Sequence, residues 1–337
     1  MEKVSRLENY KLSNLGLERS VQVNLSLPSE RWKRAFSDEA HLLLDQMRLE
    51  DLKLYHCGST SIPSIAAKPI LDILGSVGSL ADFDAKKKFL EEIGYECKGE
   101  YGIPGRRFCV LYNPAKSHSY VHLHVFQHGD PALEGHLVFR DYLRAHKSAA
   151  KEYEAEKLRL SRQTGSRSQY TEQKEPVIQK LLLEAKAWRK LPCSVVAILG
   201  SAVGGKNTQA YLQEEFPGAE VINLHAVTVE RYVYGEEARD DFPKIIEKII
   251  AADLLVIATP VYSYAMSGAT KNFFDRFSNL LRGPHKHLGE ALYGKKFILL
   301  STGSDERLPF GYEVPFNLTG TYLGMDYLGA KYRAVKS

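Results

Sequence analysis

Short apolar runs in the first 190 residues predict strands that come before a block of helices. Runs rich in β-branched and aromatic residues, bounded by turn-forming residues, predict strands at 52–57, 69–77, 107–112 and 120–127. Helical spacing predicts helices at 29–48, 59–67 and 82–93 and through the charged stretch 131–188. Because strands come early and helices gather late, we predict that residues 1–190 form an α+β domain with a mixed sheet.

Residues 191–337 follow a different pattern, in which strand and helix signals alternate. Buried strand patterns lie at 194–199, 219–224, 253–259, 296–301 and 325–332. Helical patterns lie at 207–216, 240–250, 267–282 and 316–323. This alternation predicts an α/β domain with a parallel, doubly wound sheet of five strands. The sequence therefore predicts two domains of different class, 1–190 and 191–337.

Charge and hydropathy limit the kinds of partner. The 337-residue chain has a net charge of +4, with 30 basic and 25 acidic residues in 1–190 against 15 and 16 in 191–337. This scattered excess suits a phosphate-bearing small ligand, but a specific nucleic-acid partner would need a concentrated basic face. No apolar run approaches the roughly 20 residues of a membrane helix, so we expect no membrane partner.

The cysteines and the N-terminus predict the cell compartment. Cys57, Cys97, Cys109 and Cys193 are widely spaced, form no CxxC pair and do not look like a disulfide framework. The first residues lack the apolar segment of a signal peptide. We therefore expect four reduced thiols in a cytoplasmic protein.

A phosphate-binding loop is predicted in the segment GSAVGGKNTQ, residues 200–209, after the first strand of the second domain. It nearly matches G-x-x-x-x-G-K-[ST], but Asn207 replaces the hydroxyl that would bind Mg²⁺, which argues against an NTPase. Small residues and the N-terminus of the following helix still suit a phosphate, with Ser201, Asn207 and Thr208 as donors. A plain strand-to-helix turn with a capping residue remains an alternative.

A second loop, in DLLVIATPVYSYAMSGATKNFFDR at 253–276, carries two tyrosines directly after a buried strand. Open α/β sheets bind ligands at the carboxyl ends of their strands. Aromatic side chains and Met266 offer apolar surface there, while backbone groups can bond to ring edges. This loop predicts a flat aromatic ligand, with Tyr262 and Tyr264 as ordinary core aromatics the alternative.

On these two segments, residues 194–332 resemble the NAD(P)H-dependent FMN reductases of the flavodoxin-like superfamily, whose loops read GSxxGxxNT and TPVYxxxMSGxxKNFxDR. The resemblance implies a five-stranded sheet of order 2-1-3-4-5 with FMN as cofactor. NAD(P)H would supply hydride, and electrons would pass to a small-molecule acceptor such as a quinone or a flavin. A homodimer that completes the flavin site is also implied.

The same resemblance implies roles for residues of three loops. The FMN phosphate would lie at Ser201, Lys206, Asn207 and Thr208. The flavin ring would lie along Pro260, Val261, Tyr262, Ser263, Tyr264 and Met266. The loop STGSDE would add Thr302, Gly303 and Ser304 beside the ring. Val203 and Gly204 stand where the family usually has an arginine, which is a departure from its pattern.

The first domain contains half of a nucleotidyl-transfer pattern in GSTSIPSIAAKPILDIL, residues 58–74. Such sites pair a Gly-Ser turn with two carboxylates that bind metal, spaced Asp-x-Asp on a strand so that both face one side. Asp72 fits, but Leu74 stands in place of the second acid. His122 and His124 alternate on a later strand, so both face one side and could ligate a metal such as Mg²⁺ or contact phosphate, with a structural role the alternative.

The segments GSTSIPSIAAKPILDI, HLHVF, HLVFRDYLRAH and YTEQKEPVIQKLL, in this order, resemble the GrpB family across residues 18–188. That family is assigned a nucleotidyltransferase-like fold, and its activity is poorly defined, so the resemblance implies the fold more than the reaction. Candidate residues for a nucleotide or a phosphorylated metabolite are Gly58, Ser59, Thr60, Lys68, Arg106, Arg107, Arg140 and Lys174.

Three hypotheses follow. The chain is an FMN-dependent NAD(P)H oxidoreductase fused to a nucleotidyltransferase, or the same reductase fused to an inactive domain that binds a nucleotide or phosphorylated metabolite. In the third, the second domain is a flavodoxin-like electron carrier without turnover.

Overall fold

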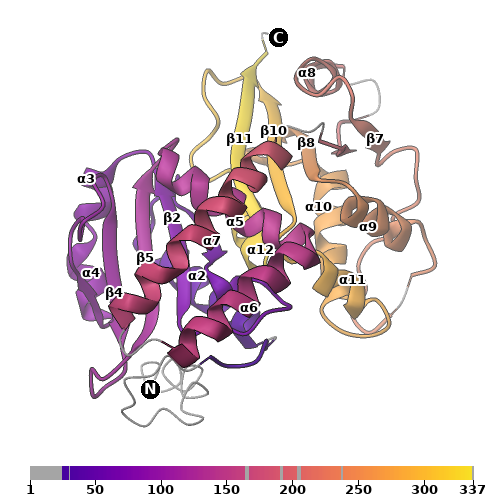
Figure 1. Cartoon of the computed structure of the whole chain (residues 1–337). Helices are drawn as coiled ribbons and strands as arrows, with labels where there is room; N and C mark the ends of the chain where they lie inside the picture. Colours follow the sequence, from indigo (N-terminus) through magenta and orange to yellow (C-terminus); the bar gives the residue numbers. More distant parts are fainter. Residues whose placement is uncertain are drawn as a thin grey trace. The chain divides into compact units, whose positions relative to one another are not determined.

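Two compact units make up the chain, residues 1–191 and 192–337 (Figure 1). The computed structural model describes residues 25–29, 31–163, 167–189, 193–202, 206–236 and 238–335. Among these residues, no helix combines the length and the hydropathy that crossing a lipid bilayer requires.

A five-stranded mixed sheet forms the centre of the first unit. Its strands are β1 (Lys53–Cys57), β2 (Leu71–Val77), β3 (Tyr95–Cys97), β4 (Arg107–Tyr112) and β5 (Ser119–Gln127), in the order β1-β2-β5-β4-β3. Strands β2 and β5 run parallel, whereas the other neighbours are antiparallel. The predicted mixed sheet is confirmed. The sequence missed β3, because three residues are too short to show a period of two.

One face of this sheet is covered by the helices α2 (Arg31–Met47), α3 (Leu80–Asp84) and α4 (Lys87–Glu92). Helix α2 buries Ala35, Phe36, Ala40, Leu43 and Met47, which recur at helical spacing. They pack against the buried strand residues Leu71, Ile73, Val121, Leu123 and Val125. Since alternate strand residues point to opposite faces, the residues between them, including Asp72 and His122, project from the other side.

The remaining helices of the first unit, α5 (Pro131–Ala145), α6 (Lys147–Gln163) and α7 (Arg167–Trp188), pack on one another. Helix α5 begins where Asp130 accepts a hydrogen bond from the Ala132 N–H and Pro131 takes the first helical position. The Gly-Ser segment forms a short 3₁₀ turn, η2 (Ser59–Ser61), between β1 and β2. Ile62 and Ile65 after this turn share a buried cluster with Leu143, Tyr153 and Leu181 of the helices.

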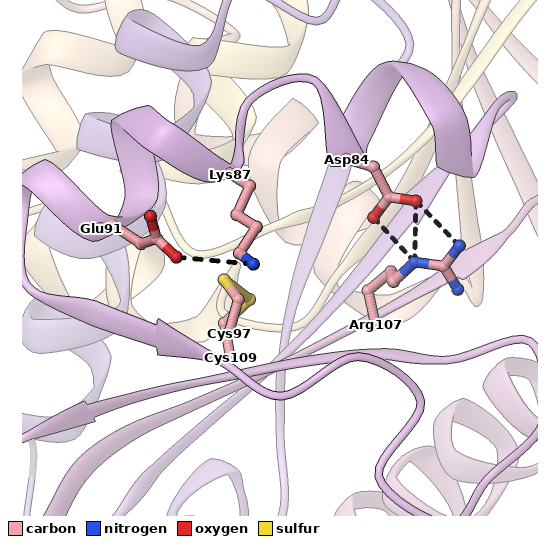
Figure 2. The surroundings of a disulfide bond; sticks show 6 residues. All are labelled: Asp84, Lys87, Glu91, Cys97, Arg107 and Cys109. Atoms are coloured by element: carbon pink, nitrogen blue, oxygen red, sulfur yellow. Dashed lines mark hydrogen bonds and ion pairs between the residues drawn. A yellow bond between two sulfur atoms is a disulfide. The ribbon is translucent and has the colours of Figure 1, made fainter.

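A disulfide joins Cys97 to Cys109 across the antiparallel pair β3 and β4, with the Cα atoms 4.1 Å apart. Figure 2 shows it beside two ion pairs, Lys87 with Glu91 (3.7 Å) and Asp84 with Arg107 (2.7 Å). The prediction of four reduced thiols is wrong for this pair, because strand register, which spacing does not reveal, places the two cysteines opposite each other. The predicted cytoplasmic location therefore no longer has the support of four reduced thiols. Cys57 and Cys193 are free thiols.

The second unit is built on a parallel sheet. Its strands are β6 (Val195–Leu199), β7 (Glu220–Asn223), β8 (Leu254–Tyr262), β10 (Lys296–Gly303) and β11 (Asp326–Ala334). Their spatial order is β7-β6-β8-β10-β11, and every one of these neighbours is parallel. This is the order 2-1-3-4-5, so the predicted flavodoxin-like fold is confirmed. A two-residue strand, β9 (Ala265–Met266), adds antiparallel pairing to β8.

Helices cover both faces of the parallel sheet. They are α8 (Asn207–Glu215), α9 (Phe242–Ala251), α10 (Gly268–Asp275), the 3₁₀ helix η3 (Arg276–Leu280), α11 (Lys286–Ala291) and α12 (Val314–Tyr322). Val196, Ile198 and Ile257 share a core with α9, α10 and α12. Ala197 and Val256, on the other face, share a core with α8. The strands therefore read as continuous apolar runs, as expected for strands buried on both faces.

Candidate functional site

The first loop of the second unit follows β6 and packs tightly against the segment that follows β8. The Gly200 N–H donates to the Ala258 carbonyl (2.9 Å), and the Ser267 hydroxyl donates to the Gly200 carbonyl. A Cβ atom at position 200 would lie 2.0 Å from Thr270 Oγ1. Only glycine fits there, so the backbone of this loop runs close to the start of α10.

The residues predicted for the FMN phosphate lie around the first turn of α8. The Thr208 and Thr302 hydroxyls are buried and 2.7 Å apart, which ties α8 to the carboxyl end of β10. Ser201 is buried, whereas Lys206 and Asn207 are exposed. Val203 and Gly204, which stand where the family usually has an arginine, lie outside the described residues.

The second loop forms a tight hairpin. Val261 pairs with Met266 and Tyr262 with Ala265, which leaves Ser263 and Tyr264 as a two-residue turn. Both turn residues have positive φ, 50° and 61°, as a type I′ turn requires. The side chains of Tyr262 and Tyr264 are 46% and 76% exposed, so neither is a core aromatic. Pro260 is buried, and Val261 and Met266 are half-buried behind them.

The third loop begins at the end of β10, where Thr302 and Gly303 are buried and Ser304 is exposed. Tyr312, which the sequence did not single out, links this loop to the second. Its hydroxyl donates to the Pro260 carbonyl (3.2 Å) and lies 3.2 Å from Ser301 Oγ. Burial raises the Tyr312 pKa to about 12, so the hydroxyl keeps its proton.

These loops fit FMN. Crowding at Gly200 holds the start of the first loop against α10, and the N-terminus of α8 follows this loop, where a helix N-terminus suits a phosphate. Exposed tyrosines at the hairpin offer aromatic surface at the carboxyl ends of the strands, the edge at which open α/β sheets bind ligands. FMN itself supplies the hydride and electron chemistry when it is bound.

In the first unit, Asp72, His122 and His124 come together on the sheet face opposite α2. Asp72 is the register partner of His122 on the parallel neighbour, and Leu74 is the partner of His124. His122 Nδ1 lies 3.2 Å from Asp72 Oδ1. One ligand atom from each of the three residues lies within 4.8 Å of the others. Alternation along β5 places His122 and His124 on one face, as predicted, and the parallel register with β2 brings Asp72 to the same face.

The charge states of this cluster follow from burial and neighbours. Burial alone would raise the Asp72 pKa, but a hydrogen bond and the charge of His122, with smaller contributions from His124 and Lys174, lower it. Burial lowers the His124 pKa to about 3, and the charges of His122 and Arg106 add to the effect. Arg106 Nη1 lies 3.3 Å from His124 Nδ1. At neutral pH the cluster therefore holds a carboxylate beside a neutral His124.

A cavity of about 450 Å³ adjoins the cluster. Cys57, Gly58 and Ser59 line it on one side, and Arg140 and Lys174 of the helices line it on another. Gly58 has a φ of +64°, and a Cβ atom there would lie 2.1 Å from Asp72 Oδ2. Gly58 is thus both a wall of the cavity and the neighbour of the Asp72 carboxylate.

Residues 22–184 match the family described as GrpB protein. The glutamate-rich protein GrpB of Alkalihalophilus pseudofirmus is 35% identical over 169 residues, which cover 48% of this chain and 95% of that protein. The chain belongs to the GrpB family. The UPF0157 protein YqkA of Bacillus subtilis is 38% identical over 190 residues, or 56% of this chain. The chain spans about half of YqkA, 54% of its length.

The second half of this GrpB-family chain, residues 193–335, matches the family described as NADPH-dependent FMN reductase. Bacillus subtilis YwqN, which carries the name of an NAD(P)H-dependent FMN-containing oxidoreductase, is 29% identical over 147 residues. That match covers 40% of this chain and 81% of YwqN. These matches support an FMN-dependent oxidoreductase, a class whose electron acceptors are small molecules.

The predicted basic residues of the GrpB domain do not all lie together. Arg107 is the register partner of Val125 and points to the α2 face, where it binds Asp84, so it does not lie with Asp72 and His122. Thr60 Oγ1 lies 3.0 Å from His56 Nε2, which indicates a structural role. Arg140 is buried and donates to the His56 carbonyl (3.0 Å) and to Asp141.

Lys68 and Lys174 belong to a cluster of three lysines, and only these two members were predicted from the sequence. Lys68 Nζ lies 4.1 Å from the centre of the Tyr170 ring, and Lys174 Nζ lies 5.5 Å from it. The third member is Lys157, which is buried and donates to the Ala66 carbonyl. It was missed because a lysine within a charged helical stretch gives no signal of burial.

Proposed function

We propose that the second domain oxidises NAD(P)H with bound FMN and passes the electrons to a small acceptor such as a quinone or a free flavin. Ser201, Thr208 and the N-terminal N–H groups of α8 would hold the phosphate, with Lys206 and Asn207 at the exposed rim. The hairpin with Tyr262 and Tyr264 would hold the ring on one side. Thr302, Gly303 and Ser304 would border it on the other.

The observation that carries this proposal is the linkage of the three loops. Thr208 contacts Thr302 at 2.7 Å, and Ser267 bonds to the Gly200 carbonyl. Three loops that share buried hydroxyl contacts form one preorganised surface, which reduces the ordering that ligand binding would require.

Absorbance of the purified full chain tests this proposal. We expect bound FMN and bleaching of the flavin when NADPH or NADH is added without oxygen. Tyr264→Ala should lose FMN affinity, whereas Tyr234→Ala, a change at another exposed tyrosine of the same domain (78% exposed), should not. Failure to take up FMN would overturn the proposal. FMN that neither nicotinamide reduces would instead indicate an electron carrier.

We also propose that the second domain forms a homodimer at its flavin loops. Phe310 is 90% exposed a few residues beyond the third loop, and Tyr264 is exposed at the second. Large exposed apolar side chains favour a second copy as their cover. Light scattering should give a dimer mass that falls in Phe310→Ser; a monomeric wild type would rule the dimer out.

For the first domain, we propose binding of a phosphorylated small molecule or nucleotide in the 450 Å³ cavity. The supporting observation is the cluster of Lys68, Lys157 and Lys174 around Tyr153 and Tyr170, with Lys174 also lining the cavity. Grouped ammonium ions repel one another, and a polyanion relieves that repulsion.

Calorimetry with ATP and with inorganic triphosphate tests this binding. Lys174→Gln should weaken both ligands. Lys180→Gln is the matched control, because Lys180 lies on the same helix but pairs with Glu152 and Glu184 at the surface. Equal losses in both variants, or no binding in the wild type, would contradict the proposal.

A further inference from the structure

We propose that Asp72, His122 and His124 bind one divalent transition-metal ion. The Mg²⁺ site that a nucleotidyltransferase-like fold implies does not fit these residues. That site needs a second carboxylate, and position 74 offers a leucine that is 2% exposed. The inference concerns the metal and its class, and it stands apart from the flavin chemistry of the other domain.

The geometry supplies three ligands on a rigid frame. Each residue has one ligand atom within 4.8 Å of the other two. Asp72 comes from β2, and both histidines come from β5, its hydrogen-bonded parallel neighbour. Strands at the centre of a sheet hold side chains more firmly than loops do. Two imidazoles and one carboxylate on one side of an ion form the facial arrangement that leaves other positions open.

Strand register explains how the missing acid is replaced. Leu74 is the register partner of His124, so the His124 imidazole emerges next to the position where a second aspartate would stand. The replacement changes the donor from oxygen to nitrogen. Imidazole suits zinc, iron, nickel and copper, whereas Mg²⁺ prefers oxygen ligands and water. The donor set at this register therefore suits zinc and its neighbours in the transition series better than it suits Mg²⁺.

Neighbouring groups orient the two imidazoles. The Phe108 ring lies 5.4 Å from the His122 ring and 4.8 Å from the His124 ring, which restricts both. Arg106 Nη1 stands 3.3 Å from His124 Nδ1. This guanidinium competes with a cation for the same lone pair, so binding through Nδ1 requires Arg106 to withdraw.

The cavity identifies the ligand class for the open coordination positions. Gly58, which lies against Asp72 Oδ2, and Lys174 both line this cavity. An anionic oxygen, such as one from a phosphate, suits both the metal and the lysine. This step rests on the proposed phosphate binding, whereas the metal site does not.

The test measures binding of Zn²⁺, Mn²⁺ and Mg²⁺ to the EDTA-treated full chain, with no phosphate or nucleotide present. We expect one Zn²⁺ per chain and Mg²⁺ binding weaker by at least about a hundredfold. Asp72→Ala and His124→Ala should each lose at least tenfold in Zn²⁺ affinity. His128→Ala is the matched control, because His128 follows β5 directly and bonds to Ser76 at 2.6 Å. Thermal melts check that each variant folds.

Two further variants sharpen the result. Leu74→Asp should raise Mg²⁺ affinity, because it restores the carboxylate pair, and Arg106→Met should raise Zn²⁺ affinity. Equal affinity for Mg²⁺ and Zn²⁺, or Zn²⁺ binding that survives both Asp72→Ala and His124→Ala in folded protein, would overturn the proposal. If triphosphate binds and no metal does, the metal site fails while the phosphate proposal stands.

Discussion

Both candidate sites begin with a Gly-Ser pair after a buried strand, yet they are built differently. In the second domain, Gly200-Ser201 opens a loop, and the site consists of consecutive residues at the ends of parallel strands. In the first domain, Gly58-Ser59 only borders a cluster whose ligands project from within β2 and β5. A site made of consecutive residues can be recognised as a motif. A site made by register depends on which strands become neighbours.

Each domain contains a buried arginine–aspartate pair, and breaking the pair of the second domain gives the largest expected loss of stability. Arg140, which pairs with Asp141, lines the cavity, whereas Arg276, which pairs with Asp240 in the second domain, packs over the Phe242 ring. Asp240→Asn should lower the free energy of unfolding of the second domain by about 3–5 kcal/mol, since it leaves a buried guanidinium without its charge partner. Chemical denaturation followed by flavin fluorescence measures this change.

The same pair predicts acid sensitivity. Burial would raise the Asp240 pKa, but bonds from Arg276 and from the Glu230 and Phe242 N–H groups lower it. A lowered folded pKa means that this stabilisation is complete above the ordinary Asp value of about 4 and is lost as pH falls below it. Asp275→Asn, which removes an exposed pair with Lys271, should cost about 0.5 kcal/mol. Equal effects of the two changes would contradict this account.

Loss of the Cys97–Cys109 disulfide should lower the stability of the first domain only. This bond closes a ring over a separation of 12 residues in the first domain. Cys97→Ser should destabilise that domain by about 3 kcal/mol, chiefly because the open unfolded chain has more freedom. The second domain should keep its melting temperature. Cys193→Ser is the control, and a shared loss in both domains on changing Cys97 would refute the assignment.

Gly58 and Gly200, one in each candidate site, allow the same substitution to be tested in both domains. Gly58→Ala and Gly200→Ala should each cost about 1–3 kcal/mol, because each Cβ meets an atom at about 2 Å. Gly58→Ala should weaken metal binding and leave FMN bound, and Gly200→Ala should do the reverse. Gly218→Ala, which has open space around it, should change neither. Loss of both ligands in either variant would show that the sites are not independent.

The smallest expected effect is the pH dependence of anion binding by the first domain, which Lys157 would cause. Burial lowers the Lys157 pKa to about 7, with Lys174 and Lys68 adding to the shift and Glu154 opposing it. Only the protonated lysine attracts an anion, so affinity for sulfate, whose charge is constant here, should fall about tenfold from pH 6 to pH 8. Lys157→Met should remove this dependence. A pH-independent wild type would exclude Lys157 from the site.

Much of this could be predicted from the sequence, for physical reasons that differ by site. Thr208 and Thr302 are 94 residues apart and lie in contact. Thr208 was predicted from the phosphate-loop pattern, whereas Thr302 followed only from the resemblance to the FMN reductases. Alternation along β5 placed His122 and His124 together. The same alternation along β4 puts Arg107 on the opposite face, beside Asp84. The disulfide and the burial of Lys157 depend on register and helix packing, which a single sequence does not encode locally.

The tip of the β8–β9 hairpin has a consequence for how this protein would evolve. Ser263 and Tyr264 occupy left-handed positions that disfavour them and favour asparagine and glycine. A library selected for thermal resistance alone should therefore drift toward Asn-Gly at this tip. A library selected for a coloured, flavin-loaded protein should retain the tyrosine, and the divergence of the two populations would record how far the needs of the ligand outweigh those of the backbone.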